Sequence, residues 1–357
     1  MSDPMPPVPV IRPGRSGRVG FALYIAFGLS VGAALIVYLF GRLGATATWK
    51  GFLSVWPATV SVLPWFLLPL TAAALSWRKL FPRRDTPAIA TAIRLTWIGL
   101  GVNWLLPVAM IGGELVKLRL ATAMGWRAAP LIASLVADKT AQVSSQLLFT
   151  LIGLGSLVAL GASLADGVQA VVVLAVFAAA VYGFYRIQHL GLFGGLTRRL
   201  AALAGATGQG MRAGARRADA ALRRIYARRR AWWGALGWRL LFRVLLAFEI
   251  WLTLRWLGHP IGVWEAITLE SLAQGARAAA FFVPAGIGAQ EGGLVAAGIL
   301  LGFPGEALLA TGLVKRVREL IIGGAALLAW QGHEALGLWH RHRHRRQAAA
   351  LAPTQDS

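Results

Sequence analysis

Two short stretches of the sequence place a glutamate seven residues after a proline, with glycines in between. They are Leu106–Glu114 and Val283–Glu291. Proline removes a backbone donor and glycine tolerates positive φ, so a helix should stop and restart in each stretch. A restarted helix directs its first amides, which carry partial positive charge, into the gap. This pattern predicts binding of a polar or charged group. The backbone-breaking residues are Pro107, Gly112, Gly113, Pro284, Gly286 and Gly288.

Charged residues recur at matching distances behind both glutamates. The residues 24 and 25 positions further on are Asp138 and Lys139 in the first case and Lys315 and Arg316 in the second. A charge at the centre of a bilayer costs at least ~2.5–3.5 kcal/mol, so such residues usually pair or line a pathway. We therefore predict one polar cavity for a lipid head group. Its members are Glu114, Lys117, Arg119, Asp138, Lys139, Glu249, Arg277, Gln290, Glu291, Lys315 and Arg316.

In this interpretation the cations attract an anionic or polyhydroxylated head group. Two alternatives stay open: each glutamate only caps the first turn of its own helix, or a given charge only forms an internal salt bridge. Glu249, in the middle of an apolar segment, either pairs with a neighbour such as Arg277 or is functional. Arg239, Arg243 and Arg255 lie near helix ends and are expected to extend their charged ends towards the membrane surface.

The elements that must position these residues are helices in a membrane. The chain of 357 residues is 57% hydrophobic and only 14% charged, against about a quarter charged in soluble domains. Apolar runs near twenty residues, the length that crosses about 30 Å of hydrocarbon, recur along it. We predict an all-α polytopic membrane protein with two Pro/Gly-broken segments, 88–137 and 262–304. The uninterrupted spans are 19–40, 53–76, 140–162, 168–187, 232–257 and 308–331.

Lysine and arginine counts orient these spans. There are three in 1–18, five in 78–94, eleven in 186–230 and four in 340–357, against two in 41–52 and none in 163–167 or 258–263. By the positive-inside rule both termini and the long basic loop are cytoplasmic, in a bacterial inner membrane. The two broken segments then enter from opposite faces, as in an inverted repeat. The domains expected are a tail 1–18, a membrane domain 19–335 and a basic tail 336–357.

The net charge of +22 indicates anionic lipid as the partner rather than nucleic acid, because the bases lie in loops between apolar segments. The loop 188–230 can form an amphipathic helix on the inner leaflet, or serve only to set topology. The absence of cysteine excludes disulfides and thiolate chemistry. We find no motif for catalysis, a cofactor or a metal, and arginines interrupt the histidines of 340–346.

At the two broken segments the sequence resembles the lysylphosphatidylglycerol synthase transmembrane-region family of flippase-like membrane proteins. Pro107–Lys139 is similar to its first signature and Phe282–Gly293 to its second, whose wording is closest to the hopanoid-associated membrane protein L branch. The resemblance implies movement or presentation of a lipid across or along the inner membrane. Full synthases of this family carry a soluble aminoacyl-transferase domain after the membrane part. Only a basic tail follows here, so lysine transfer is not expected.

The function expected is therefore lipid translocation or transport, with hopanoids as one candidate cargo and no enzyme activity. Three alternatives stay open: a membrane-embedded lipid-modifying transferase, a secondary transporter for a polar solute, and a scaffold for lipid-synthesis enzymes. The sequence leaves the lipid, the direction, the energy source and the oligomeric state undetermined.

Overall fold

The computed structural model describes residues 45–106, 112–160, 208–280 and 286–350, with a few isolated positions besides, and gives the backbone alone for 208–216 and 333–350. The expected span 168–187 and nearly all of 19–40 lie outside the described residues. Pro107 and Pro284 lie outside them as well, so their roles at the breaks stay predictions.

The described chain is helical, which confirms the predicted fold class; no strand occurs among the residues that the structure describes. The α-helices are α2 Ala45–Ser54, α3 Trp56–Trp65, α4 Leu67–Lys79, α5 Ile89–Leu105, α6 Gly112–Ala123, α7 Ala128–Ala159, α10 Gly208–Ala227, α11 Arg229–Trp256, α12 Val263–Ala279, α13 Ala289–Leu300 and α14 Gly305–Ala350. A short 3-10 turn, η1 at Arg83–Asp85, lies between α4 and α5.

Two helical stretches of this part are long and apolar enough to cross a membrane, Trp56–Lys79 and Ala128–Ala159. The first joins α3 and α4 at Phe66, just after Pro64, whose ring nitrogen cannot donate a helical hydrogen bond. The second, α7, begins twelve residues before the expected span 140–162. Large apolar side chains such as Leu68, Leu151 and Leu328 are exposed along these and other helices, as lipid contact requires.

Both broken segments form two successive helices of matching length. In the first, the 17-residue α5 is followed by the 12-residue α6, and in the second the 17-residue α12 is followed by the 12-residue α13. A glycine with positive φ, Gly125 or Gly302, then leads into a long helix, α7 or α14. We call α5–α6–α7 the first unit and α12–α13–α14 the second unit.

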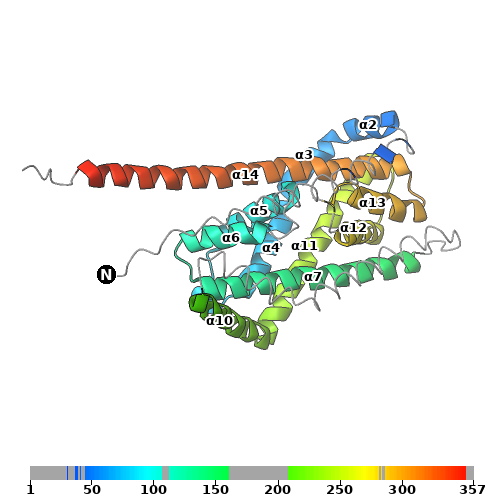
Figure 1. The fold of residues 1–357 in the computed structure, drawn as a ribbon. Coiled ribbons are helices and arrows are strands. Elements are labelled where there is room, and N and C mark those ends of the chain that lie inside the picture. Colours follow the sequence, from blue (N-terminus) through cyan, green and yellow to red (C-terminus); the bar gives the residue numbers. More distant parts are fainter. Residues whose placement is uncertain are drawn as a thin grey trace, which may run out of the picture.

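The short helices of the two units lie apart in Figure 1, with α5 and α6 to the left of α12 and α13, whereas α7 and α14 each run along much of the molecule. The long helices α7 and α14 run in opposite directions in that view, and α11 begins below α7, beside α10, and crosses α7 on its way towards α14. α11 packs against both long helices as well as against α4 and α12, and α14 packs against α5. At 12 residues, α6 and α13 are about 18 Å long, too short to cross about 30 Å of hydrocarbon alone.

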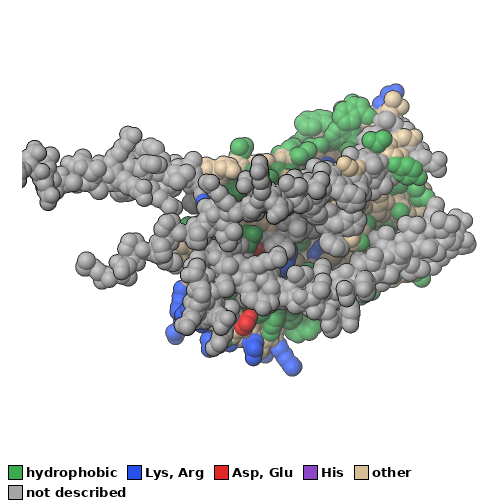
Figure 2. Space-filling model, viewed as in Figure 1, with side chains coloured by type: hydrophobic (Ala, Val, Ile, Leu, Met, Phe, Trp, Pro, Cys, Tyr) green, Lys and Arg blue, Asp and Glu red, His purple; other side chains and the backbone are tan. Residues whose placement is uncertain are grey.

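Small residues permit the close helix crossings that membrane bundles use. Gly99 of α5 faces Gly113 of α6, and Gly101 of α5 faces Gly323 of α14, with no room for a side chain at either crossing. The helix α10 buries Ala218 in the same hydrophobic core as Trp77. Its arginines form a basic group at the lower edge of the molecule (Figure 2).

Candidate functional site

Buried charged side chains gather in two clusters, one in each unit, and α11 contributes to both. The first cluster is Glu114, Lys117, Asp138, Lys139, Arg239 and Arg243. The second cluster is Glu249, Glu270, Arg277, Glu291, Lys315, Arg316, Arg318 and Glu319.

Asp138 on α7 is the centre of the first cluster and has no solvent exposure. Arg239 of α11 binds it with both ends of the carboxylate engaged, its Nη2 donating to Oδ1 at 2.6 Å and to Oδ2 at 2.7 Å. The Lys117 ammonium approaches Oδ2 less closely, at 3.7 Å, and lies 4.7 Å from the ring centre of Trp77. This carboxylate therefore joins α6, α7 and α11.

Glu114, the third residue of α6, binds across the break in the first unit. It accepts a hydrogen bond from Lys139 of α7 at 3.0 Å and a longer one from the Asn103 amide at 3.4 Å. The side-chain oxygen Oδ1 of Asn103 in turn accepts a hydrogen bond from the backbone N–H of Gly113 at 2.9 Å. Asn103 in the last turn of α5 thus holds the first turn of α6.

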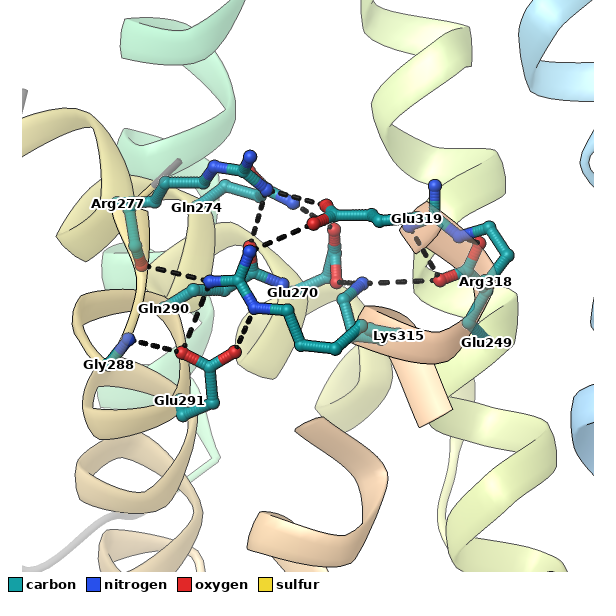
Figure 3. Close-up of polar contacts among 12 residues, drawn as sticks. Glu249, Glu270, Gln274, Arg277, Gly288, Gln290, Glu291, Lys315, Arg318 and Glu319 are labelled. Atoms are coloured by element: carbon teal, nitrogen blue, oxygen red, sulfur yellow. Dashed lines mark hydrogen bonds and ion pairs between the residues drawn. The ribbon is translucent and has the colours of Figure 1, made fainter. Parts of the chain in front are cut away.

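Glu291 has the equivalent place in the second unit, as the third residue of α13 (Figure 3). Its carboxylate accepts the backbone N–H of Gly288 at 2.9 Å and the Arg316 Nε at 2.6 Å. Arg316 also donates to the carbonyl of Gly286 at 3.0 Å, where the backbone has a φ of 62°. Glu291 is therefore both a helix cap and half of an ion pair.

The remaining carboxylates of the second cluster each have cationic partners (Figure 3). Glu319 accepts hydrogen bonds from Arg277 at 2.6 Å and from Arg316 at 2.9 Å. Arg277 also donates to the side-chain oxygen of Gln290 at 2.7 Å. These contacts fasten α12 and the start of α13 to α14.

Lys315 lies between two buried glutamates, Glu270 of α12 at 2.5 Å and Glu249 of α11 at 3.5 Å. Arg318 is 3.1 Å from Glu249, and its guanidinium lies over the ring of Phe66. Glu249 is thus paired with neighbours, as one of the two predicted alternatives had it, but these neighbours are Lys315 and Arg318 of α14 and not Arg277. The cationic side chains of one turn of α14, Lys315 and Arg318, therefore form ion pairs with carboxylates of both α11 and α12.

The structure corrects the expectation for Arg239 and Arg243 of α11. Arg239 is 2% exposed and bound to Asp138, so it does not extend to the membrane surface. Arg243 donates to Ser145 Oγ at 3.0 Å, to the carbonyl of Gln142 at 2.7 Å and to the side chain of Gln146. Both arginines thus bind polar groups of α7: Arg239 the carboxylate of Asp138, and Arg243 the polar atoms of Gln142, Ser145 and Gln146. A guanidinium can be buried when its donors are satisfied in this way.

The predicted site residues come together in these clusters, with one exception. Arg119 is on α6, but its side chain is exposed and lies outside both clusters. Sequence reasoning missed Asn103, Arg239, Arg243 and Glu270 as site residues. Glu270, a charge within an apolar stretch of α12, had a usable signal. The position of Asn103 was also a usable signal. It lies two residues before the end of α5, just as the predicted site residue Arg277 lies two residues before the end of α12.

A protein-family comparison matches residues 25–326 to the lysylphosphatidylglycerol synthase TM region. The chain belongs to this family. The match covers the first unit, α12, α13, α14 as far as residue 326, and both clusters, so the buried charges are part of a lysylphosphatidylglycerol synthase transmembrane region. Together with the apolar helices, it makes the protein a membrane protein connected with lipid. No curated protein and no solved structure matches the chain, and the family match does not distinguish its branches.

Proposed function

We propose that this protein moves or presents a membrane lipid, as a flippase-like transport factor of the bacterial inner membrane. The observation that carries the proposal is the pair of ion-paired clusters buried at the two helix breaks and joined through α11. Polar residues inside a membrane bundle are costly and usually mark a pathway. The polar head of an amphiphile would follow these clusters while its tail stays in lipid.

The likeness of the two units supports an inverted repeat of the transporter kind. In each, a glutamate at the third position of a 12-residue helix binds a cation 25 residues further on, Glu114 with Lys139 and Glu291 with Arg316. The long helices that carry these cations run in opposite directions (Figure 1). Transporter binding sites are typically built where such broken helices of two inverted halves meet.

The orientation proposed has both termini in the cytoplasm, and α10 fits that side. Its arginines Arg217, Arg223 and Arg224 are exposed, whereas Ile225 is buried against the bundle. A helix with one basic and one apolar face suits the anionic surface of the inner leaflet, where each Lys or Arg contributes about 1 kcal/mol. Anionic lipid is thus the partner that we propose for this face.

A deletion strain tests the proposal, with hopanoids first among the lipids measured. Total lipid content and the leaflet distribution of each class should be compared with the parent strain. We expect a finished lipid in normal amount but on the wrong leaflet. Accumulation of an unmodified precursor would indicate a membrane-embedded transferase instead. Unchanged content together with unchanged sidedness would reject a lipid function.

A further inference from the structure

The ion pairs of the two clusters differ in whether their cation can give up its charge. Arginine keeps its proton under all conditions that a protein meets, whereas a lysine can become a neutral amine. An arginine is among the partners of four of the six carboxylates in the clusters, which are Asp138, Glu249, Glu291 and Glu319. Glu114 and Glu270 each form their ion pair with a lysine, Lys139 and Lys315 respectively.

The pair of Glu270 with Lys315 is the lysine pair that is closed to water. Lys139 is 17% exposed, so water can reach its contact with Glu114, whereas the side chains of Lys315 and Glu270 are 1% and 0% exposed. A buried carboxylate that loses its cation cannot turn to water instead, and a proton is then the simplest way to remove its charge. Separation of this pair, which joins α12 to α14, therefore calls for a proton.

The groups around Glu270 leave it dependent on Lys315 for a bound cation. Its other hydrogen-bond donor is the uncharged side-chain amide of Gln274 on its own helix, at 2.8 Å. On α11, Arg243 attracts Glu270 through its charge, but its hydrogen bonds go to α7. Glu249 of the same helix is itself a carboxylate and shares Lys315. Neither residue of α11 therefore replaces Lys315 as a partner.

The other helices that pack against α12 are α7 and α13. α7 approaches α12 at Gly153, and α13 approaches it at Gly293, and neither position has a side chain. The charged residue of α13 is Glu291, which is bound to Arg316. Among the described residues, these helices thus supply no second bound cation to Glu270.

Two ion pairs of different kinds join α12 to α14. Glu270 binds Lys315, and Arg277, two turns further along α12, binds Glu319 at 2.6 Å. The arginine pair keeps both of its charges and so stays closed, whereas a proton on Glu270 dissolves the lysine pair. Protonation would therefore release the first half of α12 while its last turn stays fastened, so that the helix tilts about its Arg277 end.

We propose that Glu270 is a proton-binding site and that its protonation releases the first half of α12 from α14, which makes the proton the coupling ion of the second unit. In this step a proton from water forms an O–H bond with the carboxylate, and no bond within the protein breaks. Lys315 keeps its own proton and stays with Glu249, whose Oε2 lies 3.5 Å from the lysine nitrogen. The role as a coupling ion rests on the proposed function, whereas the proton site and the tilt go beyond it.

Two measurements on the purified full chain in detergent test the proton site. Infrared difference spectra between neutral and acidic pH detect the carbonyl stretch of a buried carboxylic acid. Spin labels on Trp264→Cys and Leu320→Cys, two exposed positions of α12 and α14 in a chain without other cysteines, report the distance between the helices. Position 264 lies about 20 Å along α12 from position 277, so a tilt of about 10° would move that label about 3 Å.

The variants are Glu270→Gln, which imitates the protonated acid, and Lys315→Arg, which makes the cation permanent. The matched control is Glu306→Gln, at an exposed carboxylate in the first turn of α14. We expect acidification to produce the buried-acid band and a label distance changed by about 3 Å in the unaltered chain and in the control. Glu270→Gln should lack the band and show the changed distance at neutral pH already. Lys315→Arg should show neither band nor movement.

A buried-acid band that persists in Glu270→Gln would overturn the proposal, and so would an equal response in Lys315→Arg. If Glu270→Gln does not fold, the unaltered chain and Lys315→Arg still decide the question. The outcome is also separable from that of the proposed function. Band and movement as expected, with normal lipid content and sidedness in the deletion strain, would leave the proton site and reject transport. A mislocalised lipid without a proton on Glu270 would leave transport and reject the proton site.

Discussion

Asp138 and Arg239 show how a charge pair inside the bundle is held. Their side chains are 0% and 2% exposed, and they are 101 positions apart in the chain. A pattern in the sequence cannot reveal such a pair, because an arginine eleven residues into an amphipathic-looking helix is equally compatible with reaching the membrane surface. Only the packing of α11 on α7 decides between the two.

Replacing one member of this pair should be more harmful than replacing both. Arg239→Gln leaves Asp138 with the more distant Lys117 and Lys139 for charge compensation, and breaking a buried pair from one side typically costs about 3–5 kcal/mol. Thermal unfolding of the detergent-solubilised protein should show a clear loss for Arg239→Gln. The double variant with Asp138→Asn should recover part of it, since it removes the unpaired carboxylate but also takes this carboxylate from the buried Lys117. A double variant less stable than the single one would contradict this account of the pair.

Glu291→Gln and Glu114→Gln test the two glutamates at the breaks. A glutamine can still accept the Gly288 N–H, so capping, which is worth about 1 kcal/mol, should largely persist. We expect both variants to reach the membrane in normal amount and to fail to complement a deletion strain. The control is Glu306→Gln at the exposed start of α14. Full complementation by both would show that the two carboxylates serve the structure only, as a helix cap or as ion-pair partners.

A second variant guards against a folding defect in that experiment. Removing Arg316 together with its carboxylate, as in Glu291→Gln with Arg316→Gln, leaves no unmatched charge between the two side chains. Arg316 also binds Glu319, which keeps Arg277 as a partner, so the double variant should fold with a stability close to that of Glu291→Gln, measured by unfolding temperature, yet remain inactive. Restored activity in the double variant would assign a structural role to the ion pair.

At the scale of helices, the sequence predicted which segments are broken and where. α5 ends at Leu105 and α12 at Ala279, inside the segments expected to be interrupted. The boundaries of α7 were not predicted, because Asp138 and Lys139 lower the local hydropathy and obscure a helix that continues through them. In the structure α7 starts at Ala128 and continues through both residues, whose charges are paired with Glu114 of α6 and Arg239 of α11.

Close packing of α5 on α14 should depend on glycine. A Cβ at position 101 would lie 2.7 Å from the Cβ of Ala326 and 2.9 Å from the carbonyl oxygen of Gly323. Gly101→Ala should therefore force the helices apart and destabilise the protein by about 1–3 kcal/mol, as overpacking usually does. Gly155→Ala in α7, with nothing within 4 Å, should be neutral or stabilise by up to about 1 kcal/mol. Unfolding temperatures of the two variants compare them directly.

For the whole molecule, charge counts alone predict the topology, and cysteine labelling can check it because the chain has no cysteine of its own. Cysteines introduced near positions 164 and 262 should react with an impermeant reagent in intact cells. Those near 206 and 347 should react only after permeabilisation. Labelling of position 206 from outside would reverse the orientation. It would also remove the argument that the two broken segments enter from opposite faces.

The C-terminal helix α14 is long enough that a small tilt near its ion pairs would move its far end by a larger distance. Its 46 residues extend about 69 Å, twice the hydrocarbon thickness, and it reaches well past the other helices (Figure 1). Residue 350 is about 46 Å along the axis from Glu319, so a tilt of about 10° there would carry the far end roughly 8 Å. A rearrangement of the ion pairs that tilts α14 would thus displace its C-terminal end by more than the ion-paired residues themselves move. A spectroscopic label attached near residue 350 could detect this displacement.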